Sequence, residues 1–397
     1  MDVLPPAPPT IGLGALFVKF LRFGCLAFGG PVAQIAMVRE ALIEDERWIS
    51  RERFNRLLAV MQVLPGPEAH ELCVHLGMIA RGRIGGLLAG LGFMIPGFVL
   101  MMICGWAYAS FIAGQPDWVG VLLGVQAAVL AIILRAVYRI GEHVLASSAL
   151  IGAALVALAG TLLGVPFWIV LLGAALAFAF FERSGIVIGV LIVSTGIGWL
   201  VAGSLPFASF VPAEPKAVTD AATVAALFVA GLKGGLLTFG GAYTAIPYVR
   251  DDTVGRGWIS DGAFLDGVAL AGLLPAPLVI FATFVGYIAG GWPGAIAVTL
   301  GMFLPAFAFS MIFFERLEAI VGNEQQRMLD GVAAAVVGII AGTFFDLAGS
   351  LSERATNLPV IAAIFVIALA AAWKLKGAWV VPLIVAAGAA TGLALLG

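Results

Sequence analysis

Two basic side chains lie deep inside long apolar stretches of this sequence, at matching places. Arg22 comes six residues before Phe28, and Lys233 comes six residues before Phe239. A cation in the middle of a membrane-spanning segment costs at least about 2.5–3.5 kcal/mol, so such residues usually serve a function. Arginine offers a planar fork to an oxyanion, and lysine offers a point charge. We predict that Arg22 and Lys233 face the protein interior and bind an anion; a structural ion pair or snorkelling is the alternative.

Each cation is followed by a Phe-Gly-Gly sequence. A glycine pair weakens a helix, and a proline after it suits the first turn of a new helix. A helix that restarts inside a membrane presents free N–H groups and the positive end of its dipole, which attract anions. Close helix packing through small residues is the alternative. The residues predicted to form this part of an anion site are Phe28, Gly29, Gly30, Pro31, Phe239, Gly240 and Gly241.

A second pair of matching elements is rich in proline. Two prolines separated by one residue cannot continue a helix, so each element should split its segment and start a half-helix. The alternative is a simple kink between packed helices. Because the element occurs twice, we add it to the predicted site, with the residues Pro65, Gly66 and Pro67 in the first copy and Pro275 and Pro277 in the second.

Titratable side chains follow the first proline element only. Glu68, His70 and Glu71 come directly after Pro67, and the second copy has apolar residues there. Ionisable groups beside a membrane site can carry protons, so these three are predicted proton-coupling residues. An equally weighted alternative is that they pair with Arg22 or with the arginine-rich loop near residue 50. The spacing of the histidines suits no single metal ion, and we predict neither a metal site nor a cofactor.

These residues must be positioned by helices in a membrane, because the composition allows little else. Of the 397 residues, 62% are hydrophobic and 11% are charged, and the mean hydropathy is +1.09. Soluble domains carry about 25% charged residues, so lipid must surround most of this chain. The sequence has no basic stripe for nucleic acid and no nucleophile elbow, phosphate loop or metalloprotease motif. We therefore expect neither an enzyme nor a nucleic-acid-binding protein.

The apolar segments predict an all-α, polytopic membrane protein in two halves. A proline-containing polar stretch, 203–221, is the predicted linker between an N-terminal membrane repeat, 1–202, and a C-terminal membrane repeat, 222–397. The segments that meet a span length of about 20 residues are 11–38, 54–80, 84–112, 118–141, 145–163, 166–182 and 184–202, and then 222–249, 262–290, 293–314, 327–348, 357–373 and 376–396.

The two halves repeat one sequence. Residues 17–39 and 228–250 are identical at 11 of 23 positions with an offset of 211, and a Trp-Ile-Ser element, the proline elements and several glycines match further on. Similar halves around a central site are a common transporter design. Seven segments before the second copy would invert it, which predicts inverted repeats with broken helices. A re-entrant hairpin in 54–80 is the alternative, because it reduces the conflict with the positive-inside rule but changes the parity.

At these residues the sequence resembles the chromate ion transporter family, in its long two-half form. The matching features are FGGP, a WIS/F element and PGP in the first half, and LTFGGAYTAIPYV, WIS and PAPL-x5-FVGY in the second. The resemblance covers nearly the whole chain and implies export of chromate, with sulfate as the close structural relative. The family usually has a second PGP, whereas this chain has Ala276 there.

The sequence thus predicts a secondary transporter of a small oxyanion in a bacterial plasma membrane, surrounded by lipid. Chromate export is the first interpretation, and uptake of sulfate or another small anion is the second. An anion channel or a structural membrane subunit is the alternative from another class, and a homodimer stays open. Inside-negative potential assists the exit of a dianion by about 2.3 kcal/mol per charge per 100 mV, which favours export.

Overall fold

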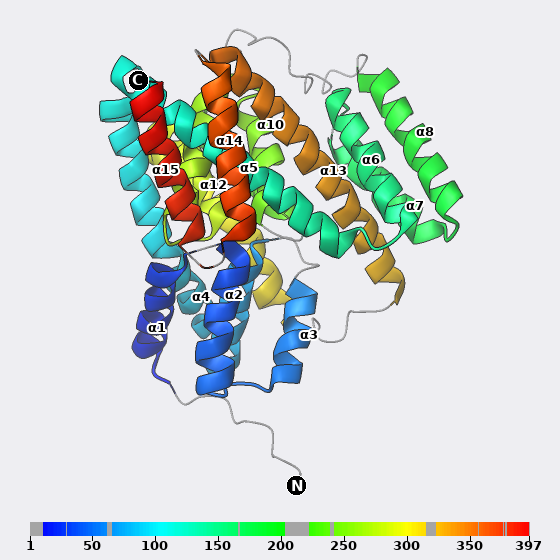
Figure 1. Cartoon of the computed structure of the whole chain (residues 1–397). Helices are drawn as coiled ribbons and strands as arrows, with labels where there is room; N and C mark the ends of the chain where they lie inside the picture. Colours follow the sequence, from blue (N-terminus) through cyan, green and yellow to red (C-terminus); the bar gives the residue numbers. More distant parts are fainter. Residues whose placement is uncertain are drawn as a thin grey trace.

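The computed structural model describes residues 11–396 except for 29, 62–65, 166, 203–221, 239–241, 315–322, 356, 376 and 378, so the predicted linker lies outside the described residues. The regular elements in these ranges are all helical (Figure 1). The α-helices are α1 (Leu13–Leu26), α2 (Gly30–Arg39), α3 (Arg51–Met61), α4 (Glu68–Ala107), α5 (Val119–Val144), α6 (Ser148–Leu162), α7 (Phe167–Phe180), α8 (Ser184–Ala202), α9 (Val224–Leu236), α10 (Ala245–Thr253), α11 (Asp261–Leu273), α12 (Phe281–Ile312), α13 (Asn323–Arg354), α14 (Leu358–Lys374) and α15 (Val380–Leu395).

Four of the predicted segments are each two helices rather than one. The segment 11–38 divides into α1 and α2, and its repeat 222–249 divides into α9 and α10. The segment 54–80 divides at the first proline element into α3 and the start of α4, and 262–290 divides at the second into α11 and the start of α12. The helix breaks predicted at the Phe-Gly-Gly and proline elements are therefore present. Serines cap both helices that precede the proline elements, since Ser50 Oγ accepts from Arg53 N and Ser260 Oγ from Ala263 N.

The long ranges α4 and α12 each contain a reversal of chain direction. Gly82 has φ +62° and ψ −158°, and Gly291 has φ +63° and ψ −159°. Gly77, before the first reversal, lies against Gly85, after it: a β-carbon added to Gly77 would lie 2.5 Å from the Gly85 carbonyl oxygen. Residues eight apart in a straight helix lie about 12 Å apart. Each range is therefore a helical hairpin, with short re-entrant arms 68–80 and 281–289 and long arms 83–107 and 292–312.

The hairpins establish that the two halves are inverted. The re-entrant arm 68–80 runs parallel to the long arm 292–312, because His70 contacts Phe303 and Phe307 and His75 contacts Phe314 further along. Within one hairpin the re-entrant and long arms are antiparallel. The two long arms, which occupy equivalent places in the repeat, are consequently antiparallel to each other. The predicted inverted repeats are correct.

The halves are also interleaved. Helix α5 of the first half packs against α14 and α15 of the second, and its repeat equivalent α13 packs against α6 and α7 of the first. A β-carbon added to Gly124 in α5 would overlap the carbonyl oxygen of Gly388 in α15, and one added to Gly338 in α13 would overlap that of Ala154 in α6. The helix backbones thus touch at glycines. Figure 1 shows α13 alongside α6 and α7, and α5 beside α14 and α15.

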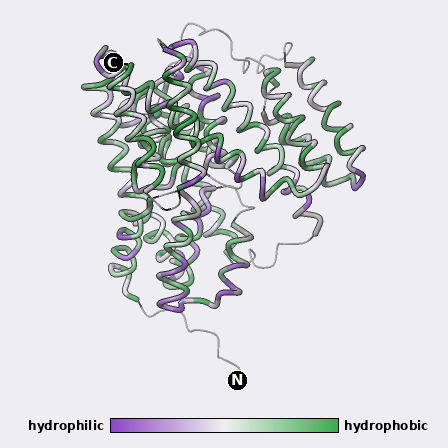
Figure 2. The backbone as a smooth tube through the Cα atoms, in the orientation of Figure 1, coloured by the Kyte–Doolittle hydropathy of each residue, from purple (hydrophilic) through white to green (hydrophobic). Residues whose placement is uncertain are grey.

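Hydrophobic residues make up most of the length of the helices, and hydrophilic residues gather mainly near helix ends and around α2 and α3 (Figure 2). The chain is a multi-pass membrane protein. The re-entrant arm 68–80 has 13 residues and reaches only about 20 Å, less than a hydrocarbon core of about 30 Å. Among the described residues, the helical ranges that are long and apolar enough to cross a membrane are Glu68–Ile112, Val119–Glu142, Leu278–Ile312 and Asp330–Arg354. The first and third contain the reversals, so in these two only the long arms 83–107 and 292–312 have the length of a membrane span.

Candidate oxyanion site

The helix break of each half lies against the proline element of the other half. The Gly66 N–H, in the first proline element, donates to the carbonyl oxygen of Thr238, directly before the second Phe-Gly-Gly sequence, at 2.8 Å. On the equivalent side, Gln34 Nε2 donates to the carbonyl oxygens of Ala27 and Ala276, both at 2.9 Å. Ala27 precedes the first Phe-Gly-Gly sequence, and Ala276 is the centre of the second proline element. The inverted repeat therefore brings the four elements together in two equivalent places. We call each of them a crossing: a helix break of one half that lies against the proline element of the other half.

Small residues allow the crossings to close. A β-carbon added to Gly97 would overlap the Cβ of Ala276, and one added to Gly66 would lie 3.1 Å from the Cβ of Ala306. Gly97 and Ala306 follow equivalent prolines in the two long arms, so each proline element rests on the long arm of the other half. The departure at Ala276 from the Pro-Gly-Pro pattern is compatible with this packing because Gly97 leaves room for its methyl group.

The predicted residues that the structure describes lie at these crossings. Phe28 stacks on Trp379, with ring centroids 4.8 Å apart, and Gly30 and Pro31 begin α2 as expected for a restarted helix. Gly66, Pro67, Pro275 and Pro277 are buried between helices. The predicted residues that lie outside the described ones are Gly29, Pro65, Phe239, Gly240 and Gly241.

The three predicted proton-coupling residues are deeply buried. His70 and Glu71 have no exposed surface and Glu68 is 7% exposed. Neither Glu71 carboxylate oxygen has a hydrogen-bond partner among the described residues, and Oε1 lies 2.5 Å from the place a β-carbon of Gly66 would occupy. The Glu71 carboxylate therefore lies at the crossing with Thr238. In the described part of the chain, neither acid forms an ion pair with Arg22, which was the alternative.

The prediction that Arg22 faces the protein interior is wrong. The buried face of α1 carries Leu16, Phe20 and Gly24, and Arg22 lies on the opposite face with an exposed side chain. Lys233 has the equivalent outward position on α9; its side chain is 37% exposed and its Nζ pairs with Asp252 Oδ1 at 3.0 Å. The sequence pattern gave both cations equivalent places in the repeat but did not fix their helix face. Anion binding by either residue stays a prediction.

Sequence reasoning missed Gln34 and Thr238, the two residues that join the halves at the crossings. Gln34 is 1% exposed and Thr238 is fully buried. The available signal for Gln34 was an amide inside an apolar segment, four residues after the glycine pair. Thr238 contributes its backbone carbonyl, so no side-chain pattern announces it.

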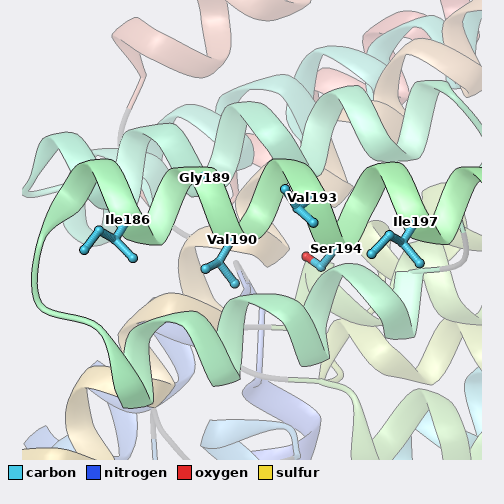
Figure 3. A pocket seen from close by; sticks show the side chains of 6 residues that line it. All are labelled: Ile186, Gly189, Val190, Val193, Ser194 and Ile197. Carbon is cyan, nitrogen blue, oxygen red and sulfur yellow. The ribbon is translucent and has the colours of Figure 1, made fainter.

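An open apolar groove lies elsewhere, on the outer face of α8 (Figure 3). Its one polar side chain, Ser194, donates its hydroxyl to the Leu191 carbonyl oxygen at 3.0 Å. The groove offers no charge or free donor for an anion. The residues that line it are Ile186, Gly189, Val190, Val193, Ser194 and Ile197.

Comparison with known proteins agrees with this geometry. The family model described as "Chromate transporter" matches residues 14–179 and 225–393, one region in each half. The chain belongs to the chromate transporter family. Membership in this family confirms the resemblance seen in the sequence, and the two matched regions coincide with the inverted halves.

Curated relatives in the family cover the chain almost completely. The chromate transport protein of Pseudomonas aeruginosa is 54% identical over 96% of this chain and 92% of its own length. The probable chromate transport protein of Synechococcus elongatus and the chromate transport protein of Cupriavidus metallidurans are each 30% identical, over 99% and 97% of this chain and over 98% and 94% of their own lengths. No solved structure matches the chain.

Proposed function

We propose that the protein is a secondary transporter that exports chromate across a bacterial plasma membrane. The observation that carries the proposal is the pair of equivalent crossings, found in a chain 54% identical to a chromate transport protein over nearly its whole length. Two inverted halves that meet at broken helices can expose one central site to either side in turn. A catalytic role has no support in the site, because the residues at the crossings form no nucleophile and base pair.

The proposed anion site lies between the two Phe-Gly-Gly breaks. Helix α2 begins at Gly30 directly after the first break, and its N-terminal N–H groups can donate to an oxyanion. The helix dipole adds about half a positive charge there. Phe28 and Trp379 form an aromatic wall at the same break. This set of donors suits a tetrahedral dianion, a description that fits chromate and sulfate equally.

The membrane potential supports export rather than uptake. An inside-negative potential assists a leaving dianion by about 4.6 kcal/mol per 100 mV, twice the value for one charge. Uptake against this potential would need co-transported cations or protons. Glu68, His70 and Glu71 are the proposed proton-coupling groups, and the Glu71 carboxylate lies beside Gly66 at a crossing. In its protonated form a carboxyl group can donate to an anion, and in its ionised form it repels one, so proton and anion occupancy are linked.

The direct test is flux of chromate into vesicles that hold the purified protein, with sulfate in competition. We expect saturable chromate flux that depends on the imposed potential, and weaker inhibition by sulfate than by unlabelled chromate. Flux of sulfate alone would favour the uptake permease. Flux that never saturates would favour a channel.

Proton coupling is tested by Glu71→Gln, with exposed Glu353→Gln as the matched control. Flux should depend on pH between 5.5 and 8, a working range of about two units around neutrality, in the parent and in the control. We expect Glu71→Gln to flatten this profile, because the amide keeps the size of the side chain and cannot titrate. The same profile in all three proteins would assign Glu71 a structural role.

The predicted role of the two cations needs a separate binding measurement. If they neutralise the dianion, Arg22→Ala and Lys233→Ala should each weaken chromate binding about tenfold to a hundredfold. Arg22→Lys should be milder because it keeps the charge. Membrane abundance must be matched, since Lys233 also pairs with Asp252. Parental affinity in both alanine variants would exclude them from the site.

A further inference from the structure

A buried carboxylate outside the crossings links the two halves. Asp266, on α11, is 2% exposed. Its Oδ2 accepts a hydrogen bond from the Tyr108 hydroxyl at 2.8 Å, and its Oδ1 accepts one from Gln126 Nε2 at 2.7 Å. Arg354 Nη2 donates to Gln126 Oε1 at 3.2 Å. This hydrogen bond of the Arg354 guanidinium therefore goes to the Gln126 amide and not to the Asp266 carboxylate.

Every one of these three hydrogen bonds joins one half to the other. Tyr108 and Gln126 belong to the first half, at the end of α4 and in α5, whereas Asp266 and Arg354 belong to the second. The Tyr108 ring also packs on Phe284 of the re-entrant arm 281–289, with centroids 5.0 Å apart. Tyr108 therefore contacts both helices that flank the second proline element.

The sequence does not repeat the carboxylate–amide pair of this network at the equivalent positions of the other side. In the repeat, Phe54 matches Phe264, which places Arg56 at the position of Asp266. Gly124 matches Gly331, which places Ala333 at the position of Gln126. Neither residue type can reproduce the carboxylate–amide bond. The bond between Asp266 and Gln126 is thus specific to one side of the inverted pair.

For the site to open to the other side of the membrane, the inverted halves must move relative to each other. Hydrogen bonds that join the halves on one side therefore affect that movement. We infer that Asp266 is a positioning residue for transport: with Tyr108 and Gln126 it forms a polar clamp that forms and releases in each cycle. The clamp holds α11, and through it the element at Pro275 and Pro277, against the first half. This inference rests on the proposed transport function.

The test compares Tyr108→Phe and Asp266→Ala with the parent, in purified full-length protein in vesicles. Two readouts are needed: chromate flux against concentration, and hydrogen–deuterium exchange of residues 261–273. Losing the Tyr108 bond should speed exchange about five- to tenfold, the effect of one net hydrogen bond. Maximal flux should change by about threefold or more while KM stays within about twofold, since the clamp does not touch the anion.

Two further variants keep the inference falsifiable. Asp266→Asn can keep both bonds, because its amide oxygen accepts from Gln126 Nε2 and its amide nitrogen donates to the Tyr108 hydroxyl oxygen, so it should stay close to the parent in both readouts. Thr299→Val removes a buried hydroxyl pair that lies within one half, between Thr283 and Thr299, and should leave flux unchanged. The Tyr108→Phe/Asp266→Ala double variant should be no more affected than Asp266→Ala alone, because both changes remove the same bond.

If folded Tyr108→Phe and Asp266→Ala proteins keep the parental maximal flux, the clamp is overturned. This holds even if their thermal stability is lower, because the bonds would then stabilise the fold without opening and closing during transport. An equal flux change in Thr299→Val would overturn it too. If the parent itself moves no chromate, the proposed transport function fails, and the clamp's role in transport fails with it.

Discussion

Gln34 shows how one side chain can hold two backbone segments of different halves. Its amide nitrogen donates to the carbonyl oxygens of Ala27 and Ala276, and both partners are buried, so the two oxygens depend on it. Backbone carbonyls beside helix breaks are not satisfied by the helix itself. A residue that looks like an isolated polar side chain in an apolar segment therefore determines the geometry of a crossing.

We expect Gln34→Leu to lower the stability of the protein by about 2–4 kcal/mol, because it leaves two buried acceptors unpaired at roughly 1–2 kcal/mol each. The measurement is chemical unfolding in detergent. Exposed Gln115→Leu is the matched control and should change stability by less than about 0.5 kcal/mol. A Gln34→Leu protein as stable as the control would show that the hydrogen bonds do not hold the crossing.

Asp251, near the C-terminal end of α10, should make stability pH-dependent. Burial, with a further contribution from Asp252, raises the pKa of its carboxyl group from 3.8 to about 7. The folded protein then keeps a proton that the unfolded chain releases, so stability falls as pH rises from about 4 to about 7. Thermal unfolding of Asp251→Asn across this range should show a smaller fall than the parent. An identical slope would mean that Asp251 is ionised in the folded protein.

At the scale of the elements, the two hairpin reversals depend on single glycines. Gly82 and Gly291 share a backbone conformation, φ near +62° with ψ near −158°, that is almost restricted to glycine. A β-carbon on Gly82 would meet no atom within 4 Å, so any cost of a side chain there comes from the backbone alone.

We expect Gly82→Ala and Gly291→Ala to destabilise the protein by about 1–3 kcal/mol each. Gly189→Ala is the matched control, since Gly189 also has open space around it but lies in the regular helix α8. That change should be neutral or stabilise by up to about 1 kcal/mol. Equal unfolding midpoints for Gly82→Ala and Gly189→Ala would contradict the strained reversal.

The helix breaks were predictable because glycine pairs and paired prolines act locally. The reversals were not, since glycines are frequent throughout this chain and only the conformation of Gly82 and Gly291 distinguishes them. The equivalent places of Arg22 and Lys233 followed from the repeat, but their outward face depends on which side of α1 and α9 packs on a partner. The crossings could not be predicted, because they depend on how the two halves pack on each other. No local sequence pattern contains that information.

At the scale of the whole molecule, the sequence repeat and the packing units do not coincide. The repeat predicts two consecutive domains, 1–202 and 222–397, yet α5 and α13 each pack on helices of the other half. Glycines such as Gly124 and Gly388 bring helix backbones of the two halves into direct contact. Either half on its own would leave this contact surface uncovered. Each half is a sequence unit whose folding depends on its partner.

We expect the chain cut within 203–221 to assemble when residues 1–202 and 222–397 are produced together. Each piece produced alone should be degraded or aggregate, because it exposes the glycine-lined face of α5 or α13. Co-purification of differently tagged pieces, followed by chromate flux, is the measurement. A single piece that is monodisperse and resists protease as the parent does would contradict this dependence.

The interleaving also sets an order of events during synthesis. Helix α5 is complete at residue 144, but α15, on which it packs, is complete only near residue 395. At about 5–20 residues per second, α5 waits roughly 10–50 s in the membrane for its partner. During that interval its glycine-lined surface is open to lipid or to other proteins. Helix α15, Val380–Leu395, is therefore decisive for the whole chain, and a ribosome that stops before this helix leaves an unfinished first half rather than a finished domain.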